Sequence, residues 1–104
     1  MIRHFLFFTL FFLFWACEAP SNNDPITGEV SGEMVYKNYC LTCHGPKGNN
    51  KVANKLMLNQ SELPDSLMRT KILYGAGSGM PAYKKMLSEE EVTAVIHHIK
   101  TLRN

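Results

Sequence analysis

The chain has 104 residues, of which 45% are hydrophobic and 19% are charged, and its formal net charge is +2 at neutral pH. This length is enough for one small domain and argues against a multidomain protein. The near balance of acidic and basic residues argues against a nucleic-acid partner and against attraction to an anionic membrane surface.

The first sixteen residues predict an export signal. Arg3 and His4 precede an apolar run from Phe5 to Trp15, which has the length of a signal-peptide core and is shorter than the ~20 residues that cross a bilayer. All six Phe and the single Trp lie in this run, so the aromatic residues belong to the signal and not to the folded domain. We therefore predict a signal peptide over residues 1–16 and an extracytoplasmic, periplasm-side location, with an uncleaved signal anchor as the alternative.

The end of the apolar run resembles the lipobox of bacterial lipoproteins, in which a small residue precedes a cysteine that becomes the lipidated N-terminus. Ala16 and Cys17 match that pattern, whereas Phe14 and Trp15 depart from it and leave cleavage elsewhere open. The resemblance implies a lipid anchor on Cys17. Cys17 is also the cysteine left over once Cys40 and Cys43 are assigned below, and an unpaired thiol is unusual in an oxidising compartment.

A linker is predicted between this cysteine and the folded domain. Glu18 to Gly28 is rich in Pro, Ser and Asn and has no apolar periodicity, a composition typical of a flexible, solvated segment. We therefore predict a lipidated N-terminus and flexible linker over residues 17–28 and one domain over residues 29–104.

Three helices are predicted within that domain. The first begins at Ser31, where apolar residues and a glycine recur at helical spacing: Gly32, Val35, Tyr36 and Tyr39. The second covers Ser66–Tyr74, after start signals at Pro64 and Asp65, and ends before Gly75. The third begins at the capping box Ser88–Glu91, and its apolar stripe consists of Val92, Val95, Ile96, Ile99 and Leu102. The segment 45–60 reads as a loop with a possible helical turn, no strand is predicted, and the fold class is all-α.

The five residues Cys40-Leu41-Thr42-Cys43-His44 form a C-x-x-C-H motif. Two cysteines at this spacing attach to the two haem vinyl groups, and the adjacent histidine binds the iron as the proximal ligand. A zinc site would need a second pair of Cys or His ligands. A thioredoxin-like site would need a strand-helix-strand context. The motif therefore predicts one covalent haem c held by Cys40, Cys43 and His44, with a haem-free thiol or metal module as a rival.

Over residues 29–103 the chain resembles the class I cytochromes c. The resemblance rests on Gly32 and Tyr36 before the motif, on Gly79-Met80-Pro81-Ala82-Tyr83 after a glycine-rich loop, and on Leu87 and Ser88 before the last helix. It implies a small cytochrome c fold of about three to four helices around one haem. It also implies Met80 as the distal iron ligand, a neutral thioether that favours reduced iron. Because Pro81 biases Met80 toward an extended backbone, the side chain of Met80 can point inward from the loop.

Other methionines and histidines are weaker ligand candidates. Met34, Met57, Met68 and Met86 are predicted to fill the core, with Met57 and Met86 as the alternative ligands. In the last helix, His98 is predicted to pack near Gly32 and Tyr36, and His97 to face solvent.

The predicted function is that of a mono-haem electron carrier and not of an enzyme. Its expected partners are redox proteins such as a terminal oxidase, a reductase or a dehydrogenase, together with a membrane through the lipid on Cys17, and no small-molecule substrate is expected. The alternative is a haem c sensor or peroxidase-like enzyme with a labile or open distal site.

Overall fold

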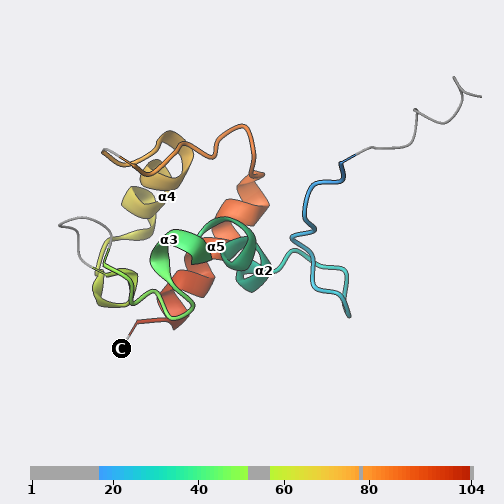
Figure 1. Ribbon diagram of the computed structural model, residues 1–104, viewed down its shortest axis with the longest axis horizontal. Coiled ribbons are helices and arrows are strands. Elements are labelled where there is room, and N and C mark those ends of the chain that lie inside the picture. The colour runs from blue at the N-terminus through green and yellow to red at the C-terminus, as the bar shows by residue number, and fades with distance from the viewer. Residues whose placement is uncertain (1–16, 52–56, 78, 104) are drawn as a thin grey trace, which may run out of the picture.

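The computed structural model describes residues 17–51, 57–77 and 79–103, so the predicted signal peptide lies outside the described residues. Its elements, in chain order, are α2 (Gly32–Tyr39), α3 (Leu41–His44), the 3-10 helix η2 (Leu58–Gln60), α4 (Asp65–Tyr74) and α5 (Glu89–Thr101), shown in Figure 1. Within these described ranges there is no strand, only two isolated bridges. The predicted all-α fold is confirmed. Among the described residues, no helix combines the length and apolar character needed to cross a membrane.

Helices α2 and α5 cross in direct contact at Gly32. A Cβ placed on Gly32 would lie 2.0 Å from the carbonyl oxygen of Ala94 and 3.1 Å from the Cβ of His98. The helix crossing therefore requires glycine at position 32, because the backbone of α5 occupies the space that a side chain would fill. On the same face of α2, Val35 and Tyr36 are buried against α5.

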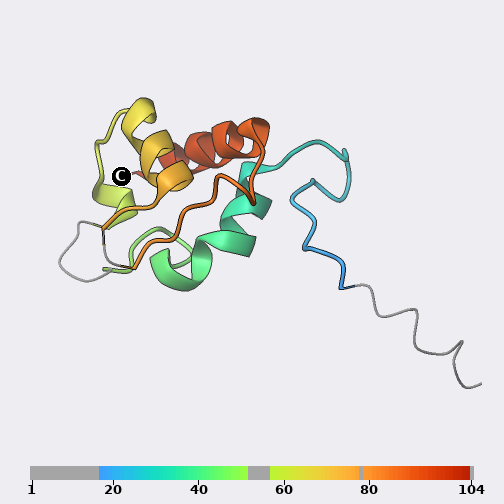
Figure 2. The same ribbon diagram turned by 90° about the horizontal axis from the view of Figure 1, so that it is seen from above.

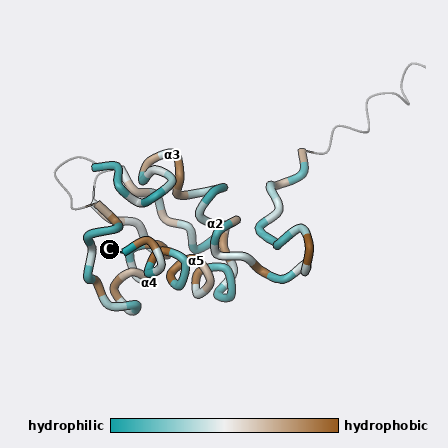
Figure 3. The backbone as a smooth tube through the Cα atoms, turned by 90° about the horizontal axis from the view of Figure 1, so that it is seen from below, coloured by the Kyte–Doolittle hydropathy of each residue, from teal (hydrophilic) through white to brown (hydrophobic). Residues whose placement is uncertain are grey.

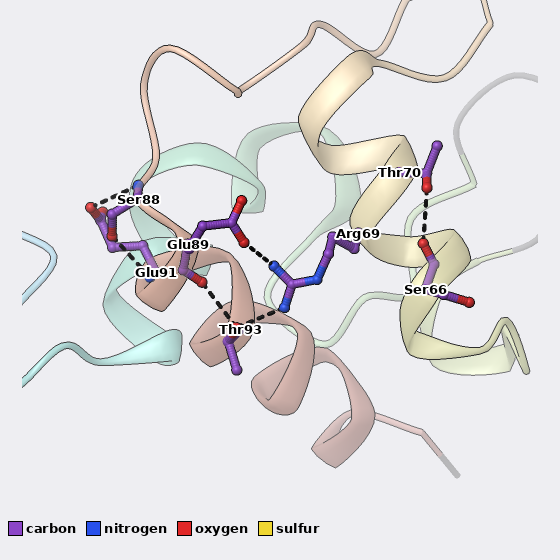
Figure 4. Close-up of polar contacts among 7 residues, drawn as sticks. All are labelled: Ser66, Arg69, Thr70, Ser88, Glu89, Glu91 and Thr93. Atoms are coloured by element: carbon purple, nitrogen blue, oxygen red, sulfur yellow. Dashed lines mark hydrogen bonds and ion pairs between the residues drawn. The ribbon is translucent and has the colours of Figure 1, made fainter.

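Helix α5 is defined by its first turn and its apolar stripe. Ser88 Oγ accepts a hydrogen bond from the Glu91 amide at 3.1 Å, and the Glu91 carboxylate accepts one from the Ser88 amide at 3.3 Å, so the predicted capping box is present (Figure 4). Hydrophobic and hydrophilic residues alternate along the helix in Figure 3. The apolar stripe is buried at four of its five predicted members, Val92, Val95, Ile96 and Ile99, while Leu102 is half-buried at the helix end.

Helix α4 packs on α5 and is fastened to it by Arg69. The guanidinium of Arg69 lies 2.5 Å from a carboxylate oxygen of Glu89 and donates to the hydroxyl of Thr93 at 2.7 Å (Figure 4). These contacts are exposed, so we expect them to contribute at most about 1 kcal/mol. The larger contribution comes from burial of Met68 and Ile72 in the common core.

The core consists of nine buried apolar residues, and a further set of partly buried ones packs against it. The buried residues are Val35, Tyr36, Met68, Ile72, Leu87, Val92, Val95, Ile96 and Ile99. The partly buried set is Tyr39, Cys40, Leu41, Leu58, Leu63, Leu73, Met80, Tyr83 and Leu102. The partly buried set includes residues of α3, of η2 and of the loop after α4, which are the segments that carry the candidate site.

The segment before α2 differs from the predicted flexible linker. Asp24 closes a turn by accepting hydrogen bonds from the amides of Ile26 and Thr27, and Ser31 donates its amide to the carbonyl of Asn22 at 2.9 Å. The side chain of Asn22 then accepts from Asn38 of α2 and donates to the carboxylate of Glu91 in α5. The polar groups of these residues satisfy one another, a pattern that composition does not reveal. We call residues 21–31 the N-terminal turn.

The N-terminal turn lies at one end of the molecule and the loop that follows α4 reaches the other end, in both perpendicular views (Figures 1 and 2). In both views, the described segment before α2 extends beyond the helical body.

Candidate functional site

The C-x-x-C-H motif forms one short helical turn. Cys40 is the N-cap of α3, the His44 amide donates to the Cys40 carbonyl at 2.9 Å, and the Gly45 amide donates to the Leu41 carbonyl at 2.8 Å. Residues three and four apart lie on the same side of a helix. The turn therefore brings the side chains of Cys40, Cys43 and His44 to one face, as covalent attachment and ligation of a haem would require.

The two thiols of this turn are free and unlike those of a redox-active disulfide. Cys40 is half-buried, Cys43 is exposed, and neither forms a disulfide. Burial, with a smaller contribution from the neighbouring Cys43, raises the pKa of the Cys40 thiol to about 11. Reactive thiols of exchange enzymes have lowered pKa values because the thiolate is the nucleophile. A protonated Cys40 at neutral pH therefore argues against the thiol-redox rival.

His44 is half-buried at the end of the turn. Burial lowers the pKa of its imidazole, so the ring is uncharged at neutral pH, the form in which histidine binds a metal. Its backbone carbonyl accepts from the Asn50 amide at 3.0 Å. The next residue, Gly45, has φ +78, and a Cβ there would lie 2.8 Å from the Asn50 side chain. The chain therefore turns away from His44 at a residue that only glycine suits.

Tyr36 of α2 stabilises this turn through its hydroxyl group. Its hydroxyl donates to the Gly45 carbonyl at 2.6 Å, and its ring lies against His98 with centroids 5.2 Å apart. Burial raises the pKa of Tyr36 to about 12, so the hydroxyl remains a donor at neutral pH. These contacts confirm that His98 packs near Gly32 and Tyr36, and His97 is exposed as predicted.

Met80 lies in the loop that connects α4 to α5, where it is half-buried and packs against the core. The loop closes on itself because the Ala76 amide donates to the Met80 carbonyl at 3.3 Å. Gly75 has φ +84, and a Cβ there would lie 2.8 Å from the Met80 carbonyl oxygen. Beyond Pro81, the amides of Tyr83 and Lys84 donate to the carbonyls of Ile72 and Leu73 in the last turn of α4. The loop is thereby held as a closed hairpin next to α4.

Tyr83 connects the Met80 loop to the cysteine motif. Its hydroxyl donates to the carbonyl of Tyr39 at 3.2 Å, and the two rings meet edge to face with centroids 6.0 Å apart. Burial, and after it the Cys40 and Cys43 thiols, raise the pKa of Tyr83. The loop that carries Met80 and the turn that carries His44 are therefore neighbours, although 36 positions separate the two residues in the sequence.

The donor set and its surroundings suit a haem c. Two free thiols, one uncharged imidazole and one thioether are the groups that such a cofactor takes from a protein. The partly buried apolar residues around them, including Leu41, Leu58 and Tyr83, are residues that an apolar ring system would cover further. None of the described residues that are buried is polar or charged.

The remaining methionines differ in how deeply they are buried. Met68 is buried in the core, in agreement with its prediction, whereas Met34 and Met57 are half-buried and belong neither to the core nor to the residues packed against it. The prediction for Met86 is wrong, because its residue is 56% exposed. The amides of Met86 and Leu87 both donate to the Tyr83 carbonyl, and the tight turn that results places Leu87 in the core instead. Cys17 is exposed and precedes the N-terminal turn.

Sequence reasoning assigned no role to the hydroxyls of Tyr36 and Tyr83. Both residues lie in the segments that carry the family resemblance, which is the signal that could have drawn attention to them. Their acceptors are backbone carbonyls 9 and 44 positions away, and such long-range partners leave no trace in local sequence patterns.

Comparison with known proteins identifies the family. Residues 29–99 match the family model described as cytochrome C oxidase, cbb3-type, subunit III. The chain is 33% identical over 70 residues to cytochrome c-553 of Helicobacter pylori, which covers 62% of this chain and 71% of that protein. Its fold is similar to the solved structure of the KustC0563 c-type cytochrome, with a TM-score of 0.65 and 24% identity over 72% of this chain and 100% of the other.

The family match spans both the Cys40–His44 turn and the Met80 loop, and it agrees with the all-α fold around them. Membership implies a covalently bound haem c, an electron-transfer role and the extracytoplasmic location typical of such relatives. The chain belongs to the family of the cbb3-type cytochrome c oxidase subunit III and is a class I, mono-haem cytochrome c.

Proposed function

We propose that Cys40 and Cys43 would attach the haem, that His44 and Met80 would ligate its iron, and that the protein exchanges electrons with redox proteins outside the cytoplasm. When bound, the haem supplies one-electron chemistry at its iron. A terminal oxidase or a reductase is a suitable electron acceptor and a dehydrogenase a suitable electron donor. We expect membranes that contain such an acceptor to oxidise the reduced protein, and a dehydrogenase with its substrate to reduce the oxidised protein.

The observation that carries this proposal is the single helical turn that presents Cys40, Cys43 and His44 on one face. A protonated Cys40 thiol and an uncharged His44 imidazole are the forms from which thioether bonds and an iron–nitrogen bond can be made. The bond from Tyr83 to Tyr39 supports Met80 as the second ligand, because it brings the Met80 loop beside this turn.

Optical spectroscopy of the exported holoprotein tests the ligands. We expect the haem to remain with the chain after denaturation, and we expect this retention to weaken in Cys40→Ala and Cys43→Ala. We also expect a ferric thioether-to-iron charge-transfer band that disappears in Met80→Ala, and carbon monoxide binding by the ferrous form of that variant only. Met86→Ala is the matched control because Met86 is exposed. Carbon monoxide binding by the unmutated protein would contradict Met80 ligation and favour the sensor or peroxidase-like alternative.

We further propose that residues 1–16 form a signal peptide and that Cys17 carries a lipid that holds the domain at a membrane. Cys17 is exposed and free, in agreement with this role. Because the N-terminal turn begins at Ser21, about four residues remain as a tether, an extended reach of roughly 14 Å. We expect Cys17→Ser to move the holoprotein from the membrane fraction to the soluble fraction, with the mass of the lipid lost. A Cys17→Ser protein that stays with the membrane would favour an uncleaved anchor.

A further inference from the structure

Tyr83 uses all three of its polar groups to join separate parts of the fold. Its amide donates to the Ile72 carbonyl at 2.9 Å, and its hydroxyl donates to the Tyr39 carbonyl at 3.2 Å. Its own carbonyl accepts from the amides of Met86 and Leu87, both at 2.9 Å.

The two acceptors of Tyr83 lie at the ends of the two helices that directly precede the segments with the candidate ligands. Ile72 belongs to the last turn of α4, directly before the Met80 loop, and Tyr39 is the last residue of α2, directly before Cys40. Carbonyls in the last turn of a helix have no partner within the helix. Tyr83 therefore satisfies one orphan carbonyl on each helix and fixes the two helix ends relative to each other.

The glycines near the tip of the Met80 loop contribute little to holding Met80 in place. A Cβ placed on Gly77 or on Gly79 would meet no atom within 4 Å, so no other part of the fold approaches these two glycines closely. Pro81 and Ala82, which follow Met80, are exposed. Besides the contact of its own side chain with the core, Met80 is restrained by the bond between Ala76 and Met80 and by the bonds of Tyr83, three residues further on.

We propose that Tyr83 is a positioning residue for the distal ligand. Its hydroxyl holds the Met80 loop beside the Cys40–His44 turn, and so determines how easily a competing ligand displaces Met80 from the iron. This inference rests on the proposed ligation by Met80. Loss of the hydroxyl leaves the Tyr39 carbonyl without this partner and frees the loop to move away, while the ring contact with Tyr39 remains.

The test is an imidazole titration of the ferric holoprotein, followed through the thioether-to-iron charge-transfer band. For Tyr83→Phe we expect imidazole to bind about fivefold more tightly, the factor that corresponds to one net hydrogen bond. Tyr39→Phe is the matched control, since it removes a phenolic hydroxyl from the ring that touches Tyr83 but keeps the Tyr39 carbonyl. We expect its imidazole affinity to equal that of the unmutated protein.

Hydrogen exchange gives a second readout that does not depend on imidazole. In Tyr83→Phe, the amides of Ala76, Tyr83 and Lys84 should exchange faster, because their bonds close the Met80 loop, while amides in α5 keep their rates. Equal imidazole affinity in Tyr83→Phe and Tyr39→Phe, with the band present in the unmutated protein, would overturn the role of Tyr83 alone. Absence of the band from the unmutated protein would overturn Met80 ligation, and the role of Tyr83 with it.

Discussion

At the scale of single residues, the buried hydroxyl of Tyr36 helps to hold the cysteine turn in place. Tyr36 is 2% exposed, and its hydroxyl bonds to the Gly45 carbonyl next to His44. When a buried acceptor loses its partner, the cost is about 1–3 kcal/mol. The same hydroxyl also makes stability depend on pH, because burial raises its pKa from 10.0 to about 12.

We therefore expect Tyr36→Phe to lower the free energy of unfolding of the holoprotein by about 1–3 kcal/mol, as measured by urea denaturation at neutral pH. Between about pH 10 and pH 12, the unfolded chain loses the Tyr36 proton and the folded chain keeps it. The stability of the unmutated protein must then fall with rising pH in this window, and this fall should be less steep in Tyr36→Phe. Parallel pH profiles for the two proteins would contradict the raised pKa of Tyr36.

At the scale of elements, the crossing of α2 and α5 depends on one glycine. The carbonyl oxygen of Ala94 lies 2.0 Å from the position of a Gly32 Cβ, and this oxygen belongs to the backbone of a helix with a continuous buried stripe. The helix cannot yield at one residue without shifting its whole apolar face, because protein cores are closely packed.

We expect Gly32→Ala to destabilise the holoprotein by about 3 kcal/mol, the upper end of the usual cost of overpacking. Glu33→Ala serves as the control, since Glu33 is the exposed neighbour in the same helical turn and should cost less than about 1 kcal/mol. Thermal unfolding of the two variants measures both effects. A Gly32→Ala protein as stable as Glu33→Ala would show that the two helices do not approach this closely.

At the scale of the whole molecule, the N-terminal turn adds a polar layer to one end of the helical body. Asn22 is its centre, with its carbonyl bonded to Ser31 and its side chain bonded to Asn38 and Glu91. Because Glu91 also closes the capping box of α5, one carboxylate serves both the helix and the turn.

We expect Asn22→Ala to release the N-terminal turn, so that limited proteolysis cuts near Ile26, which is 91% exposed at the tip of the turn, several-fold faster. The core should be affected by no more than about 1 kcal/mol, since the lost bonds are at the surface. Asn23→Ala is the matched control because the exposed side chain of Asn23 forms none of these bonds. Equal cleavage rates in the two variants would mean that the Asn22 bonds do not hold the turn.

The sequence by itself determined the local features of this protein. The capping box at Ser88, the stop at Gly75 and the helical spacing of the apolar residues predicted the three longer helices to within one residue at most ends. The C-x-x-C-H motif predicted a covalently bound haem c, in agreement with the family. These predictions succeeded because caps, periodicity and motif spacing act over a few neighbouring residues.

Only the tertiary structure decided which distant groups meet. The hydroxyl of Tyr83 bonds to Tyr39, and that of Tyr36 bonds to Gly45. Met86 is exposed, whereas Leu87 is buried. The segment expected to be a flexible linker forms a turn that is hydrogen-bonded to Asn38 and Glu91. In each case the partner is a backbone carbonyl, a polar side chain or a core position supplied by another part of the fold. Composition describes one segment at a time, so it cannot reveal partners that become available only after the helices pack.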